Sequence, residues 1–89
     1  MVARNLHEVK ELKELLEHIT GFIADYGGEQ YLDDPAFRYA CDVADALAWV
    51  LGEIDTGKFT GPDYLNLDKL IAIVKKIEEE RGVKFSEYK

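Results

Sequence analysis

The chain has 89 residues, of which 47% are hydrophobic and 33% are charged, and its formal net charge at pH 7 is −7. This composition excludes a disordered tail and fits one globular domain with a single modest core. Charged residues interrupt every apolar run well before the roughly 18 residues that a membrane span requires.

The first predicted helix runs from about Asn5 to Tyr26. Asn5 followed three residues later by Glu8 is a capping-box pattern, and the pair Gly27-Gly28 is a natural stop. Residues at helical spacing define one apolar face, with polar side chains opposite. The apolar face holds Val9, Leu12, Leu15, Leu16, Ile19, Phe22, Ile23 and Tyr26, and the opposite face holds Glu11, Glu14, His18 and Asp25.

The second predicted helix starts at the sequence DDP, where Asp34 can cap the helix and Pro35 suits its first position. We expect it to continue to about Asp55. The following stretch DTGKFTGPD breaks the helical pattern with two glycines and a proline.

The third predicted helix begins between Gly61 and Asn66. Thr60 with Asp63 can form a capping box around Pro62, or Asn66 can be the cap, and we prefer the earlier start. We expect the inner face to hold Leu67, Leu70, Ile71, Ile73, Val74 and Ile77, and the helix to end at Gly82.

Three amphipathic helices with short links predict an all-α fold, a small three-helix bundle formed by one helical domain over residues 1–89. The last residues, VKFSEYK, alternate weakly, so they are expected to form a docked C-terminal tail or a short edge strand.

The middle helix separates into two faces when residues 37–55 are wound at about 100° per residue. A broad arc, roughly 220° wide, is apolar. The other arc holds Arg38, Asp42, Asp45, Gly52 and Glu53, with Trp49 in its middle. Because tryptophan and arginine dominate many binding interfaces and a polar rim surrounds them, we predict a partner-binding patch of Trp49, Arg38, Asp42, Asp45 and Glu53. The competing interpretation is that Trp49 folds over its own helix or under the tail and completes the core.

The apolar arc of this helix is too broad for contact with only two other helices. The C-terminal tail, with Val83, Phe85 and Tyr88, can cover the excess, or a second copy of the chain can do so. Homo-oligomerisation is therefore an open expectation, since contiguous apolar surface is uncommon on monomers.

The acidic residues are concentrated in the first two thirds of the chain. Residues 1–30 hold six acidic and three basic side chains, residues 31–62 hold six and two, and residues 63–89 hold six of each. No basic face is available, so we do not expect nucleic-acid binding. The acidity suits a basic protein partner or serves solubility.

The start of the chain, MVARNLHEVKELKE, has no apolar region of the kind found in a secretory signal. The chain has one cysteine, whereas small secreted domains usually depend on several paired ones. We therefore expect a cytoplasmic protein that is not membrane-bound.

Catalytic and metal-binding motifs are not evident in the sequence. Cys41 lies on the apolar arc, away from His7 and His18, and is expected to be a small core residue rather than a nucleophile. The two histidines stand 11 residues apart, about 16 Å along a helix, so they cannot share one ion. We predict no catalytic residue, no metal site and no cofactor.

Acidic pairs on two helices point to one enzymatic alternative. Glu8, Glu11, Glu14 and Glu17 give repeated E-x-x-E spacing, and Asp42 with Asp45 gives D-x-x-D. Such pairs can hold Mg²⁺ against a nucleoside triphosphate. The arrangement is similar to the E-x-x-E and E-x-x-D pairs of the all-α nucleotide pyrophosphatases of the MazG type. The resemblance covers these two pairs only and implies a metal-dependent nucleotide hydrolase.

A second alternative is a homo-oligomer that sequesters a small anionic, nucleotide-type ligand. The stretch DTGKFTG lacks the phosphate-binding loop pattern, but Lys58 and Arg38 could serve as its cations. Our leading hypothesis remains a non-enzymatic, acidic helical interaction protein that binds a macromolecular partner through the Trp49 face. Its size and charge are typical of small accessory proteins, including the inhibitors carried by phages and mobile elements.

Overall fold

The computed structural model describes residues 3–88, and every regular element within them is helical, which confirms the all-α prediction. The long helices are α1 (Leu6–Tyr26), α3 (Pro35–Val50) and α5 (Leu67–Arg81). Short helices lie between and after them: α2 (Glu29–Leu32), α4 (Thr56–Phe59) and the 3₁₀ helix η1 (Phe85–Glu87). The chain divides into two compact units, residues 1–55 and 56–89. The expectation of a single domain stays a prediction.

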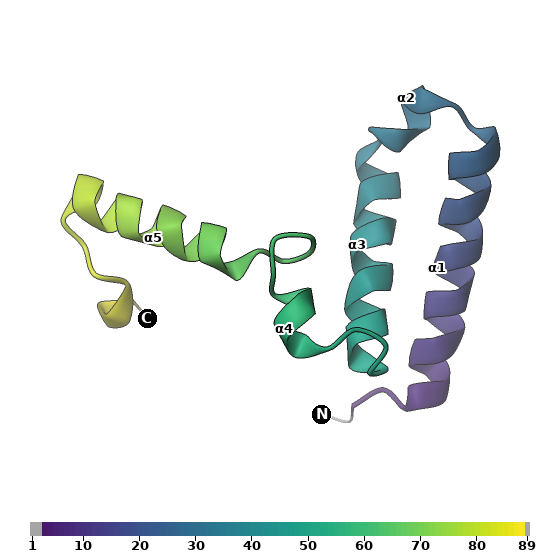
Figure 1. Cartoon of the computed structure of the whole chain (residues 1–89), viewed down its shortest axis with the longest axis horizontal. Helices are drawn as coiled ribbons and strands as arrows, with labels where there is room; N and C mark the ends of the chain where they lie inside the picture. The colour runs from purple at the N-terminus through teal and green to yellow at the C-terminus, as the bar shows by residue number, and fades with distance from the viewer. Residues whose placement is uncertain (1–2, 89) are drawn as a thin grey trace. The chain divides into compact units, whose positions relative to one another are not determined.

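The first unit is a helical hairpin in which α1 and α3 run antiparallel, with α2 in the connection (Figure 1). Both helices start where the sequence predicts. The Asn5 side chain accepts a hydrogen bond from the Glu8 backbone N–H at 2.8 Å, and Asp34 accepts one from the Ala36 N–H at 2.8 Å. Each cap satisfies a backbone donor that has no partner inside the helix.

Helix α3 ends at Val50, five residues earlier than expected from its apolar pattern. Gly52 adopts a left-handed conformation with φ of 79°, which most other residues avoid. The Gly52 N–H then donates to the Trp49 carbonyl at 3.0 Å and the Glu53 N–H to the Ala48 carbonyl at 2.9 Å. These two bonds close the last turn, so the helix cannot continue toward Asp55.

Helix α5 begins after Asn66, so the preferred start near Thr60 is wrong and the alternative is right. The preceding residues form a hydrogen-bonded turn. The Asn66 N–H donates to the Gly61 carbonyl at 2.8 Å and the Leu67 N–H to the Thr60 carbonyl at 3.0 Å. Asn66 itself is left-handed, with φ of 52°, and its side chain accepts from the Lys69 N–H at 3.3 Å. A capping box at Thr60 does not form, because the Thr60 N–H that the Asp63 carboxylate would have to bind donates to the Thr56 carbonyl at 3.0 Å.

The end of α5 agrees with the sequence prediction. Gly82 has φ of 67°, and its N–H donates to the Glu78 carbonyl at 2.9 Å. The tail then folds back as η1 rather than as an edge strand, and the Phe85 N–H donates to Glu78 Oε2 at 2.8 Å. The tail is therefore docked on its own helix by a charge-assisted hydrogen bond.

Candidate functional site: two faces of the helical hairpin

The contact between α1 and α3 follows a spacing of alternating three and four residues, as in coiled coils. Ala44 and Ala48 are buried, each 8% exposed, on the helix that packs against α1. We call these positions the seam: Val9, Lys13, Leu16, Thr20 and Ile23 on α1, with Phe37, Cys41, Ala44 and Ala48 on α3 and Leu51 just after it. All seam residues are buried or half-buried, so the alanines do allow the two backbones to come close.

Lys13 is the one charged member of the seam, and it is buried. Its ammonium lies 2.6 Å from Glu53 Oε1 and 3.2 Å from Glu17 Oε2. The hydrogen bond to Glu53 is the main cause that raises the pKa of Lys13 above its usual value, with Glu17 contributing and burial opposing. Lys13 is not among the predicted site residues, although its spacing of four from Val9 and three from Leu16 places it in line with the apolar positions.

The residues that directly follow the seam positions lie on one side of the hairpin, because in two antiparallel helices these positions flank the seam on the same side. We call this the polar side of the hairpin. On α3 these positions are Arg38, Asp42, Asp45 and Trp49, spaced by four, three and four residues. The structure thus places four of the five predicted patch residues in one stripe. Trp49 is 40% exposed there.

The remaining predicted patch residue, Glu53, lies beyond the end of α3 and binds Lys13. Arg38 lies at the other end of the stripe, 3.9 Å from Asp33 Oδ1. Lys58, the second cation of the ligand-sequestering alternative, belongs to α4 in the other compact unit.

Asp42 and Asp45, in the middle of the stripe, affect the pKa of the neighbouring Cys41 thiol. Burial, reinforced by the charge of Asp42, raises the pKa of the Asp45 carboxyl above its ordinary value. Burial, with the charges of Asp45 and Asp42, raises the pKa of the Cys41 thiol. A thiol in an acidic, half-buried place stays protonated and is a poor nucleophile.

The repeated E-x-x-E glutamates of α1 form a row of contacts with basic side chains, three of which are ion pairs with arginine or lysine. Each glutamate has a basic partner four residues earlier, as Arg4, His7, Lys10 and Lys13 precede Glu8, Glu11, Glu14 and Glu17. Because these four contacts repeat every three residues along α1, they account for the same E-x-x-E spacing that resembles a metal-binding pattern. Within residues 3–88 no group of three or more His, Cys, Asp or Glu side chains is placed to hold a metal ion.

One residue before each seam position lies the apolar side of the hairpin. On α1 the residue before Val9 is Glu8, and those before the other four seam residues are Leu12, Leu15, Ile19 and Phe22, which are 46%, 52%, 41% and 62% exposed. Tyr26, 79% exposed, continues this row four residues after Phe22. The rings of Phe22 and Tyr26 stack obliquely, with centroids 5.2 Å apart. On α3 the matching positions are Ala36, Ala40, Val43, Leu47 and Val50. Helix α3 thus covers three of the eight residues of the apolar face predicted for α1 and leaves the other five exposed.

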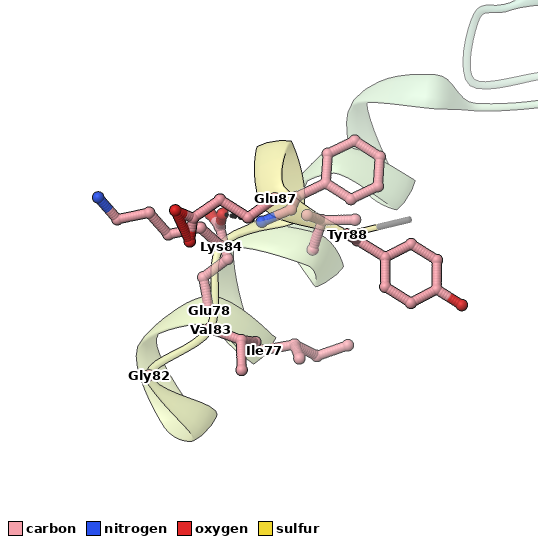
Figure 2. Close-up of a pocket in the computed structure, with 9 residues that line it drawn as sticks. Ile77, Glu78, Gly82, Val83, Lys84, Glu87 and Tyr88 are labelled. Atoms are coloured by element: carbon pink, nitrogen blue, oxygen red, sulfur yellow. Dashed lines mark hydrogen bonds between the residues drawn. The ribbon is translucent and has the colours of Figure 1, made fainter.

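A third feature lies within residues 56–89, where the tail folds over the end of α5. It is an open, mainly apolar pocket of about 540 Å³. Figure 2 shows Ile77 and Tyr88 on one side of it, while the Lys84 chain extends away from Tyr88. Phe85 is held there by the bond to Glu78.

The fold and these faces define a small, acidic, all-helical protein whose hairpin has one polar and one apolar side. No protein-family model matches the chain, and neither the curated proteins nor the solved structures give a significant match. No helix among the described residues is long and apolar enough to cross a membrane.

Proposed function

We propose that this chain is a non-enzymatic interaction protein that binds a basic segment of a protein partner through the polar side of the hairpin. The observation that carries the proposal is the stripe itself. Trp49, a large and partly exposed aromatic residue, stands in line with Asp45 and Asp42 on one helix.

The chemistry of the stripe suits arginine and lysine side chains. A tryptophan face attracts a cation within about 6 Å of its ring, and nearby carboxylates add charge-assisted hydrogen bonds. Residues 1–55 carry twelve acidic and four basic side chains, a difference of −8, so a basic segment is also drawn to this unit over longer distances. Arg38, at the end of the stripe, is offset by Asp33.

Trp49 is the only tryptophan in the chain, so its fluorescence reports directly on the site. The experiment is a titration of the full chain with arginine- and lysine-rich peptides, and with matched peptides in which glutamine replaces every cation. We expect a saturable change in Trp49 emission with the basic peptides alone. The change Asp42→Asn together with Asp45→Asn should weaken binding at least about tenfold, since removing a charged partner of a hydrogen bond costs about 1.5–3 kcal/mol.

The matched control removes the same charge elsewhere in the unit. Asp25→Asn with Glu29→Gln changes two exposed carboxylates outside the stripe, so it should weaken binding only to the small extent that net charge explains. Equal weakening by the two double variants would contradict a specific site and leave general charge attraction as the explanation. Absence of saturable binding to any basic peptide would contradict the proposal outright.

The same protein tests the two alternatives. Hydrolysis of nucleoside triphosphates with Mg²⁺, lost in Asp42→Asn, would support the pyrophosphatase-type enzyme instead. Nucleotide uptake that disappears in Lys58→Ala or Arg38→Ala would support the sequestering oligomer. The contacts of α1 speak against the first, because Glu8, Glu14 and Glu17 are already paired with arginine or lysine.

A further inference from the structure

The apolar side of the hairpin lacks a covering element within residues 3–55. Its five α1 side chains are all more than two fifths exposed, and they continue along the helix for four turns without a charged residue at these positions. A contiguous apolar surface of this length is uncommon on a monomer and marks an interface.

The area of this surface reaches the lower limit of what specific dimers bury. With about 200 Å² for each aromatic side chain, the exposed fractions of Phe22 and Tyr26 correspond to about 280 Å². Full burial of an aliphatic side chain removes about 120–150 Å² from water, so the exposed fractions of Leu12, Leu15 and Ile19 add about 200 Å². Helix α3 contributes Val50 and its smaller neighbours, so each chain offers about 500 Å² or slightly more, and two chains together reach the ~1,000 Å² that a specific interface needs.

The sizes of the side chains on this surface suit pairing with a second copy. Toward the α2 end, α1 presents its aromatic residues Phe22 and Tyr26, whereas α3 presents Ala36 and Ala40. Toward the other end both helices present aliphatic side chains of similar size, such as Leu15 and Leu47 on α1 and α3.

We propose that the apolar side of the hairpin is the docking surface for a second copy of this chain. The two hairpins pair about a twofold axis parallel to the helices, with their α2 turns at the same end. Each α1 then lies beside the α3 of the other copy, and the aromatic rings of one copy fill the space above the alanines of the other. Such a self-matching patch is what a twofold interface requires, and the result is a four-helix bundle.

The test is the mass of the full chain by sedimentation over a range of concentrations. We expect about twice the chain mass of 10.1 kDa. Phe22→Glu and Leu15→Glu place a charge in the interface and should raise the dimer dissociation constant by about 100-fold or more. Ala24→Glu places the same charge on the exposed, polar side of α1 and should leave the dimer intact.

A second measurement keeps the test valid if a glutamate variant fails to fold. In a Cys41→Ala background, chains carrying Phe22→Cys are mixed with chains carrying Ala40→Cys and then oxidised. The mixture should form a covalent dimer of one chain of each kind, faster than a mixture in which Ala24→Cys replaces Phe22→Cys.

Three results would overturn the proposal. One is a monomeric wild-type chain at every concentration. If Phe22 were protected from solvent in such a monomer, another part of the same chain would have to cover it. Another is an assembly of more than two chains. The third is a dimer that Phe22→Glu and Leu15→Glu leave unchanged.

Discussion

The close approach of α1 and α3 can be tested by enlarging one seam alanine. Ala44 is 8% exposed, and the change Ala44→Leu adds three carbon atoms where the two helices meet. Overpacking of this kind costs about 1–3 kcal/mol, while the helix propensities of alanine and leucine are nearly the same. A melting temperature shifts by about 4–8 °C per kcal/mol in a domain of this size. We therefore expect Ala44→Leu to melt about 5–20 °C below the wild type.

The assay is thermal unfolding followed by far-ultraviolet circular dichroism, at one protein concentration because association also stabilises. The control is Ala24→Leu, the same change at an exposed position of α1. It should shift the unfolding free energy by no more than about 0.5 kcal/mol. If the two variants melt together, α1 and α3 are not in close contact at Ala44, and the seam as described is wrong.

Three further predictions concern charged groups. Because its pKa is raised in the folded state, ionised Asp45 opposes folding, so Asp45→Asn should raise the melting temperature at pH 7 and lose this advantage near pH 3, where wild-type Asp45 is also neutral. The ion pair with Glu53 stabilises the fold below pH ~10.5, and this stabilisation is lost as the pH rises through the raised pKa of Lys13. Lys13→Met should therefore lose less helicity than the wild type, by circular dichroism, when the pH is raised above this range. Glu78→Ala removes the acceptor of the Phe85 N–H, so that amide should exchange hydrogen faster while amides in the middle of α1 are unchanged.

The ends of the helices could be predicted from the sequence where a local signal decides them. Asn5, Asp34 and Gly82 each act on backbone groups within a few residues, and the structure places all three as expected. The start of α5 was harder because two local signals compete. Asn66 is the cap, since its side chain accepts from the Lys69 N–H, whereas the Thr60 N–H donates to the Thr56 carbonyl and cannot complete the competing box.

The use of each helix face could be predicted only in part. Periodicity identifies the apolar face of α1, but it cannot say which part of that face α3 will cover. The seam residues of α1 and the residues one position before them form two neighbouring rows. Rotating α1 by about 100° about its axis would exchange these two rows. In the structure, the row that contains Lys13 and Thr20 packs against α3, and Leu12 and Phe22 stay exposed.

The two proposals use opposite sides of the same hairpin and are therefore compatible. The apolar side lies one residue before the seam, and the Trp49 stripe lies one residue after it. Pairing through the apolar side leaves both Trp49 stripes on the outside of the dimer, so the dimer would offer two sites to a basic partner. Two linked sites bind a partner with repeated basic segments more tightly than one, without any new contact. Phe22→Glu should then weaken binding to such a repeated partner but not to a single segment, whereas loss of Asp42 and Asp45 should weaken both.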